Sequence, residues 1–175
     1  SSPSTMVPPM PPDFEELDYQ ETPLGTLILR RRRLRSLDDL EVYEIILGEG
    51  YLMSSLFTTV EIALANLALA LLPAEKRELS VAVGGLGLGY TAQAALKDSR
   101  VSELVVVEAL PDVIGWHRKE LVPLGKEIHN DPRCRLIEGD FFSLAAGQGF
   151  DPEEPGRCFD AILLDIDHSP RNLIH

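Results

Sequence analysis

The stretch VAVGGLGLG at residues 81–89 joins an apolar run to a turn in which four of six residues are glycine. Residues 79–83 are predicted to form a strand and residues 90–97 a helix, so the turn lies between the two. Gly85, Gly87 and Gly89 allow the backbone to turn tightly and to approach a ligand, and the helix beyond offers free N–H groups. Packing of a helix on a strand also favours small residues, so the turn alone leaves both interpretations open.

The alternation of strand, turn and helix continues after this turn. Further strands are predicted at 103–107, 135–138 and 159–165, and a helix at 112–121. The runs LVVVE and AILLD are apolar on both faces, as expected of parallel strands covered by helices. The predicted fold class is therefore doubly wound α/β. Such a sheet usually extends beyond four strands, so we expect the fold to be truncated after the fourth strand, with its C-terminal part missing.

The part before residue 58 has a different pattern. Segments with strand character alternate with turn residues, at 17–21, 25–34, 41–47 and 51–54. This pattern predicts a small antiparallel β subdomain. The predicted domains are a disordered tail rich in Ser and Pro (1–12), the N-terminal β subdomain (13–57) and a nucleoside-binding α/β domain (58–175).

A helix is predicted from residue 58 to residue 72, before Pro73. The stretch Thr58-Thr59-Val60-Glu61 fits a capping box at its start. Ala and Leu occupy nearly every face, which predicts a buried helix. In the strand at 25–34, the run of four arginines invites a nucleic-acid interpretation. Without interleaved aromatic residues, a solvated strand end or a charged sheet edge is favoured.

Composition and charge limit the classes of partner. Of the 175 residues, 45% are hydrophobic, which excludes disorder as the main state. The 16 Lys and Arg against 28 Asp and Glu give a net charge of -12. This charge disfavours nucleic acid and membrane surfaces and favours a cationic ligand. No secretory signal pattern is found at the N-terminus, so a cytoplasmic location is expected.

Three predicted strands end in acidic residues. Glu108 follows the glycine turn by about 20 residues, where a carboxylate can accept hydrogen bonds from ribose hydroxyls. Asp140 ends the next strand and is predicted to accept a hydrogen bond from an adenine amino group. The alternatives are a solvated strand end for Glu108 and a turn-forming Gly-Asp for Asp140.

The last predicted strand ends in Asp165, followed by Asp167 and His168. Ligands bind at the carboxyl ends of strands near the switch point of such sheets, so this cluster is predicted to be a reactive site. The alternative is a loop whose acids cap backbone groups. Adjacent residues on one extended segment do not all converge on one ion, so no metal site is predicted. Trp116 and His117 are expected to be a packed residue and a surface residue of their helix.

These residues resemble the spermidine synthases, or polyamine aminopropyltransferases, on the Rossmann-like class I methyltransferase fold. The likeness covers about residues 14–175 and rests on five stretches in the family's order: YQETPLGTLILRRR, VAVGGLGLGYTA, VVVEALPDVI, DPRCRLIEGD and FDAILLDIDHSP. The resemblance implies that Glu108 holds the ribose and Asp140 the adenine of decarboxylated S-adenosylmethionine. Asp165 would be the general base for an attacking amine, and Asp167 and His168 would bind that substrate. It also favours a homodimer.

The sequence departs from this family at three places. Leu88 stands where the family's turn has an Asp, and Thr59-Val60-Glu61 replaces a Tyr-His-Glu on the preceding helix. His168 stands at the second Asp of the catalytic loop. A rival resemblance is to cation-dependent O-methyltransferases, through Gly89-Tyr90-Thr91 and the segment that begins at Asp165. The leading function is thus aminopropyl transfer to an amine. Methyl transfer from S-adenosylmethionine and a non-catalytic nucleoside-binding domain remain as alternatives.

Overall fold

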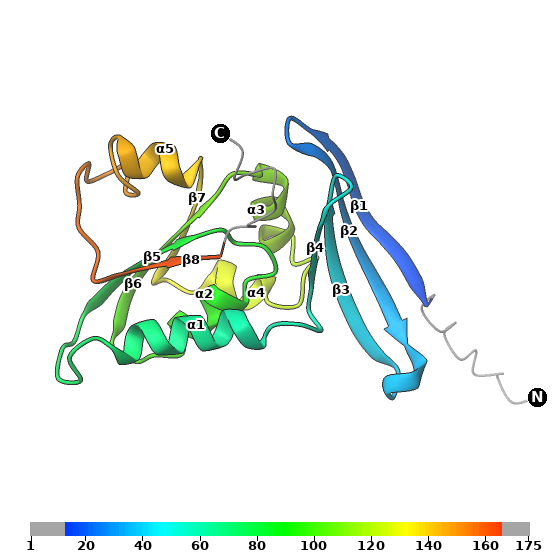
Figure 1. The fold of residues 1–175 in the computed structure, drawn as a ribbon, viewed down its shortest axis with the longest axis horizontal. Coiled ribbons are helices and arrows are strands. Elements are labelled where there is room, and N and C mark those ends of the chain that lie inside the picture. The colour runs from blue at the N-terminus through cyan, green and yellow to red at the C-terminus, as the bar shows by residue number, and fades with distance from the viewer. Residues whose placement is uncertain (1–12, 166–175) are drawn as a thin grey trace, which may run out of the picture.

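The protein is built from two four-stranded sheets, shown in Figure 1. The computed structural model describes residues 13–165 of the chain. The predicted tail at 1–12 and the predicted site residues Asp167 and His168 lie outside the described residues. The change from antiparallel strands to α/β pattern falls between residues 54 and 59, close to the predicted boundary. Whether the two parts fold as separate domains stays a prediction.

The first sheet is antiparallel and follows the chain. Its strands are β1 (Phe14–Thr22), β2 (Gly25–Leu34), β3 (Leu40–Leu47) and β4 (Tyr51–Ser54), in that order, with a short helix η1 (Arg35–Leu37) between β2 and β3. Gly25 lies directly after the turn that joins β1 to β2 and has a φ of 121°, which glycine adopts without strain. Leu27 and Leu29 alternate with more exposed residues along β2 and are fully buried.

The arginine run lies within this sheet, on an inner strand. Arg30 and Arg32 both form ion pairs with Glu44 of the neighbouring strand β3. Arg31 is only 7% exposed, and glutamates of β1 and β3 lie 2.9 Å from its guanidinium. The prediction of a solvated strand end or a charged edge is therefore wrong. The arginines join three strands because the glutamates stand directly or diagonally opposite them in the register.

The second sheet is parallel and confirms the predicted doubly wound α/β class. Its strands are β5 (Leu79–Gly84), β6 (Val101–Glu108), β7 (Cys134–Glu138) and β8 (Ala161–Leu164). They lie in the order β7-β6-β5-β8, so the chain moves outward from β5 in one direction and then returns to its other side. The switch point of the sheet therefore lies between β5 and β8.

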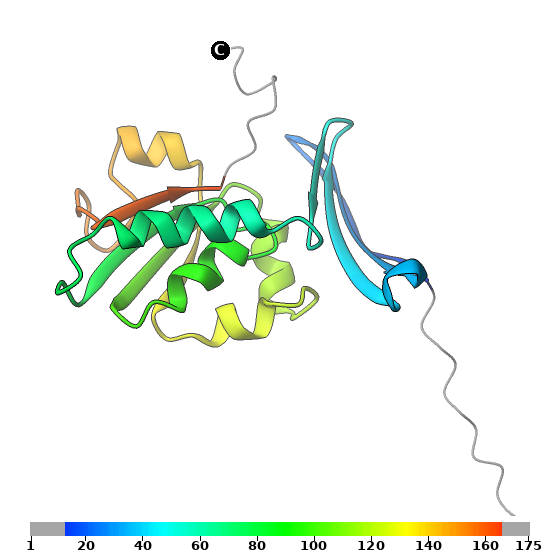
Figure 2. The same cartoon turned by 60° about the horizontal axis from the view of Figure 1, so that its bottom comes forward.

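Helices cover both faces of the parallel sheet. Figure 2 shows α1 (Thr59–Ala70), α2 (Tyr90–Leu96), α3 (Pro111–Arg118) and α4 (Gly125–Asn130) on one face and α5 (Phe141–Ala146) on the other. Val81 and Val83 pack with the first group, whereas Ala82 between them packs with Phe141. The strands are apolar throughout because each face has its own core. The helices α4 and α5 were not predicted, since six residues show too little periodicity.

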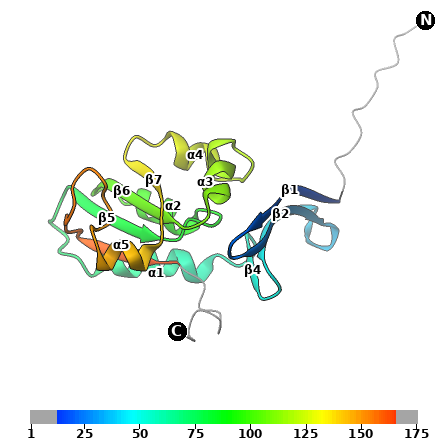
Figure 3. The same cartoon turned by 90° about the horizontal axis from the view of Figure 1, so that it is seen from above.

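The helix α1 is buried on one side only, which corrects the prediction of a wholly buried helix. Ala65 and Leu69 face the core, whereas Val60, Leu67 and Leu71 are 80%, 66% and 86% exposed. The helix packs against α2 and β8, and no other described element lies over its outer side. Seen from above, α1 begins beside the antiparallel sheet (Figure 3).

Two Asp-x-Arg segments fasten the helices to the sheet. Asp98 and Arg100 precede β6, and Asp131 and Arg133 precede β7; in each segment the aspartate pairs with the arginine at 2.8 Å. Arg100 donates a hydrogen bond of 2.9 Å to a carbonyl in the last turn of α1, and Arg133 does the same at the end of α2. Each arginine therefore adds a hydrogen bond at the end of a helix, where the intrahelical ladder stops.

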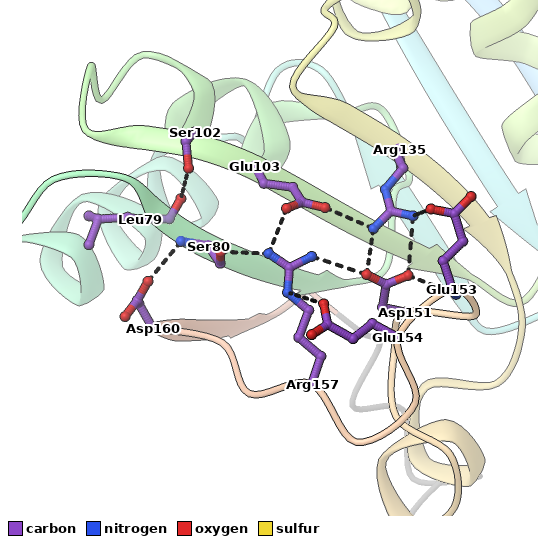
Figure 4. Close-up of polar contacts among 10 residues, drawn as sticks. All are labelled: Leu79, Ser80, Ser102, Glu103, Arg135, Asp151, Glu153, Glu154, Arg157 and Asp160. Atoms are coloured by element: carbon purple, nitrogen blue, oxygen red, sulfur yellow. Dashed lines mark hydrogen bonds and ion pairs between the residues drawn. The ribbon is translucent and has the colours of Figure 1, made fainter.

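The amino ends of the parallel strands are closed by an ion-pair network, shown in Figure 4. Arg135 lies 2.8 Å from both Glu103 and Asp151, and Arg157 lies 2.5 Å and 3.0 Å from the same two carboxylates. Asp151 is 3% exposed, and its hydrogen bonds with the two arginines hold its pKa well below the usual range. The buried carboxylate of Asp151 is thus paired with two arginines of the same chain.

Candidate functional site

The glycine turn lies at the carboxyl ends of the parallel strands, opposite the ion-pair network. The glycine turn follows β5, and its three predicted glycines Gly85, Gly87 and Gly89 all have positive φ, at 98°, 50° and 92°. A Cβ at Gly87 would collide with the Met53 side chain, and one at Gly89 with Ile128. The positive φ angles favour glycine at both positions, and the absence of a Cβ leaves space that the Met53 and Ile128 side chains occupy.

Glu108, the predicted ribose ligand, ends β6 beside this turn. Its Oε1 accepts hydrogen bonds from the N–H groups of Leu86 at 3.0 Å and Gly87 at 3.4 Å. Its Oε2 accepts one from Leu110 N–H at 3.0 Å. A carboxylate has about four acceptor positions. Glu108 therefore holds the turn in shape and retains room for a hydroxyl donor, so the residues present fit a ribose. The ribose role itself stays a prediction.

Asp165, the predicted catalytic residue, lies directly after β8 at the switch point. Its N–H donates to the carbonyl of Gly84 at 2.7 Å, which joins the ends of β8 and β5. Its Oδ2 accepts a hydrogen bond of 3.0 Å from Thr91 Oγ1 on α2. Burial raises the pKa of Asp165, the Thr91 hydroxyl opposes that rise, and the charge of Glu108 adds to it. The structure thus brings Asp165, the glycine turn and Glu108 together at the carboxyl end of the sheet.

Glu61 is a site residue that the sequence interpretation missed. Thr58 has φ −116° and ψ −5° and forms no side-chain hydrogen bond at the start of α1, so the predicted capping box is not formed. A capping residue needs extended backbone to reach the N–H groups of the first turn. Burial, followed by the nearby charge of Asp165, raises the pKa of Glu61 from 4.5 to about 7. Glu61 therefore belongs with Asp165.

The two carboxyl groups titrate as an interacting pair. The charge of Asp165 adds to the effect of burial in raising the pKa of Glu61, so ionisation of Asp165 hinders ionisation of Glu61. Tyr90 lies close enough for the charge of Glu61 to add to the effect of burial in raising its pKa. With its pKa raised to about 7, Glu61 keeps part of its proton near neutral pH.

Asp140, the predicted adenine ligand, is exposed at the end of β7. Its Oδ1 accepts a hydrogen bond of 2.8 Å from Ser143 N–H, so it caps the start of α5. This is the structural role named as the alternative for a Gly-Asp pair, and it occupies one oxygen only. The adenine role therefore stays a prediction.

Two side chains near the turn are placed differently from the prediction. Leu88 is fully buried in the core, so position 88 presents no side chain to the crevice. His117, expected at the surface, is also fully buried, and its Nε2 lies 2.8 Å from the carbonyl oxygen of Gly87. Helical periodicity did not reveal this, because α4 and the glycine turn cover the face of α3 on which His117 lies. Trp116 is packed as predicted, at 1% exposed.

The described part of the chain contains neither a cluster of metal ligands nor a helix that could span a membrane. Among residues 13–165, no three His, Cys, Asp or Glu side chains are gathered as a metal site requires. Within that range, none of the helices has the length and hydrophobicity needed to cross a membrane.

The antiparallel sheet followed by the β7-β6-β5-β8 arrangement defines a class I methyltransferase-like fold with an N-terminal β sheet. A crystal structure of spermidine synthase from Thermotoga maritima matches 86% of this chain with a TM-score of 0.65 and 18% sequence identity. A spermidine synthase in complex with the transition-state analogue AdoDATO matches 87% with the same TM-score and identity. The chain spans 46% and 47% of the length of these two proteins. No family model matches the sequence.

The fold that the resemblance implied is thereby confirmed. At 18% identity, the likeness shows the fold and not the reaction.

Proposed function

We propose that this chain contributes the nucleoside-binding part of a transferase that acts on an S-adenosyl sulfonium. The proposed reaction is transfer of the aminopropyl group of decarboxylated S-adenosylmethionine to a small amine. The observation that carries the proposal is the pair Glu61 and Asp165 beside the glycine turn. Both carboxyl groups have raised pKa values, and the described hydrogen-bond partners of Asp165 are a hydroxyl and a backbone carbonyl.

A cation is the ligand that this pair favours. At the amino ends of the strands, Asp151 is neutralised by two arginines, and its pKa is lowered. At the carboxyl ends, burial raises the pKa values of Glu61 and Asp165, and no arginine or lysine among residues 13–165 forms an ion pair with either. An ammonium group bound between them would stabilise their ionised forms. The net charge of -12 favours the approach of the same ligand.

The chemistry assigned to the chain is positioning and proton transfer. A sulfonium makes the neighbouring methylene carbon open to displacement. In the proposed step, the amine nitrogen forms a C–N bond as the C–S bond breaks, and sulfur leaves as a neutral thioether. Ionised Asp165 accepts the proton that the nitrogen loses, and Thr91 orients its carboxylate. Glu108 would hold the ribose, and Asp140 the adenine.

The test is calorimetric titration of the protein with S-adenosylmethionine and with its decarboxylated form. Preference for the decarboxylated form supports aminopropyl transfer. Preference for the intact form moves the function to methyl transfer, which buried Leu88 favours because position 88 offers no carboxylate to repel the methionine carboxylate. Binding of neither form contradicts both enzymatic functions and supports a non-catalytic domain.

Amine binding offers a second test. Because Glu61 has a pKa of about 7, a cation bound beside it should release up to about half a proton at pH 7. Titration of the nucleoside-loaded protein with putrescine as the probe amine, in two buffers of different ionisation enthalpy, measures this release. The Glu61→Gln variant should release none through this group. Equal release by the variant and the wild type would place the amine elsewhere.

A further inference from the structure

The peptide group that joins Gly87 to Leu88 is held at both of its polar atoms. Its carbonyl oxygen lies 2.8 Å from Nε2 of His117, and its N–H donates to the sulfur of Met53 at 3.3 Å. His117 comes from α3, whereas Met53 comes from β4 of the antiparallel sheet. Two parts of the protein therefore meet at one peptide of the glycine turn.

The chemistry of His117 defines one arrangement of this contact. A carbonyl oxygen only accepts hydrogen bonds, so Nε2 must carry the hydrogen. Nδ1 is buried and has no hydrogen-bond partner in the described part of the chain. A second proton on the ring would lie unpaired in the core, and burial accordingly lowers the pKa of His117. The ring is thus a neutral donor in a fixed tautomer.

Met53 provides the contact on the other side of the peptide. Its side chain lies where a Cβ of residue 87 would be, and it is 9% exposed. The Leu88 N–H is buried with it, so the thioether sulfur, although a weak acceptor, satisfies a donor that water does not reach. A leucine of similar volume at position 53 would fill the space and leave that donor unpaired.

Fixing this peptide also fixes the groups that face the crevice. The N–H of Gly87 belongs to the adjacent peptide and donates to Glu108 at 3.4 Å. Displacement of the Gly87–Leu88 peptide would move the Cα of Gly87, which the two peptides share, and with it the N–H that donates to Glu108. We propose that His117 and Met53 are positioning residues of the nucleoside turn, which hold Glu108 in the orientation that receives the ribose. This inference rests on the proposed function of the turn.

Variants can separate positioning from simple packing. His117→Phe removes the donor, whereas His117→Gln keeps an amide N–H at the corresponding distance along the side chain. Met53→Leu removes the acceptor. The matched control is Trp116→Phe on the same helix, which removes a partly buried hydrogen bond of 2.6 Å to Asp18 and none of the described hydrogen bonds of the turn.

Two measurements are made on each variant. Amide hydrogen exchange at Gly87 and Leu88, followed by NMR without ligand, reports the turn directly. Calorimetric titration with whichever form of S-adenosylmethionine the wild type prefers measures the nucleoside affinity that depends on the turn. We expect about tenfold faster exchange at Leu88 in Met53→Leu and about tenfold weaker binding in His117→Phe, each the effect of one lost hydrogen bond. His117→Gln should bind within about threefold of the wild type.

The control and the rescue decide the outcome. Trp116→Phe should lower stability and leave affinity unchanged. Unchanged exchange at Gly87 and Leu88 in both His117→Phe and Met53→Leu would overturn the inference, as would equal loss of affinity in Trp116→Phe and His117→Phe, or failure of His117→Gln to restore binding. If the wild type binds neither nucleoside, the proposed function fails by itself, and the exchange rates still test the positioning.

Discussion

The half-buried carboxyl group of Glu61 predicts a pH-dependent gain in stability when it is replaced by glutamine. Burial and the charge of Asp165 raise its pKa from 4.5 to about 7. With about 1.4 kcal/mol for each tenfold change in proton affinity, this rise corresponds to about 3 kcal/mol. Because part of the side chain faces solvent, screening reduces the expected effect to about 1–2 kcal/mol.

The direction follows from the protonation of the two states. Below pH 4.5, Glu61 is protonated in both the folded and the unfolded chain, and its environment has little effect on stability. As the pH rises toward about 7, the unfolded chain ionises while the folded chain keeps its proton, so the wild type loses stability across this window. Glutamine stays neutral throughout. Glu61→Gln should therefore match the wild type near pH 4 and exceed it by about 1–2 kcal/mol at pH 8.

The assay is urea unfolding at both pH values, followed by the fluorescence of Trp116, the single tryptophan. Exposed Glu75 provides the control, since Glu75→Gln removes the same charge from a solvated position and should change the unfolding free energy by less than about 0.5 kcal/mol. A Glu61→Gln variant that is less stable than the wild type at pH 8, or more stable by the same amount at both pH values, would refute the argument.

Three further variants test the rest of the site and its support. Asp165→Asn should reduce turnover by about 100-fold or more and leave nucleoside affinity within about tenfold, measured by steady-state kinetics and calorimetry; unchanged turnover would exclude the base. Glu108→Ala should lower both nucleoside affinity and unfolding free energy by roughly 1–3 kcal/mol, because three backbone N–H groups lose their acceptor. A loss of affinity without a loss of stability would show that the turn does not depend on Glu108. Arg157→Met should lower the unfolding free energy by about 2 kcal/mol at pH 7 and by less at pH 3. The reason is that Asp151, whose pKa is lowered in the folded state, stabilises the fold above its unfolded pKa of about 4 and loses this effect as the pH falls. An equal loss of unfolding free energy at both pH values would contradict the ion-pair explanation.

Local sequence was sufficient to predict the parallel sheet and the acidic residues at the carboxyl ends of its strands. The runs 104–107 and 161–164 are apolar in every position, and the acids Glu108 and Asp165 follow them directly, so strand ends and candidate site residues could be found together. Both residues lie where the carboxyl ends of parallel strands meet. Neither inference needs knowledge of distant contacts.

The parts that were missed depend on contacts between distant residues. Glu61 approaches Asp165 only because α1 lies against β8, about 100 residues later in the chain. Its local pattern, Thr-x-x-Glu, instead favours a capping box. His117 is buried by the glycine turn and by α4, a helix too short to predict. The inward direction of Leu88 follows from the positive φ angles on both sides of it, which composition alone does not fix.

The pH dependence of Glu61 and the proposed ligand are two results of the same electrostatics. A carboxyl group with a raised pKa is ionised at a free-energy cost, and a bound ammonium removes that cost. The fold therefore loses stability on ionisation when the ligand is absent, and ligand binding should recover it. If amine binding stabilises the wild type more than Glu61→Gln at pH 8, and equally at pH 5, the pair is the amine site. If amine stabilises both proteins equally at pH 8, the raised pKa is a property of the fold alone, and the amine site must be sought elsewhere in the crevice.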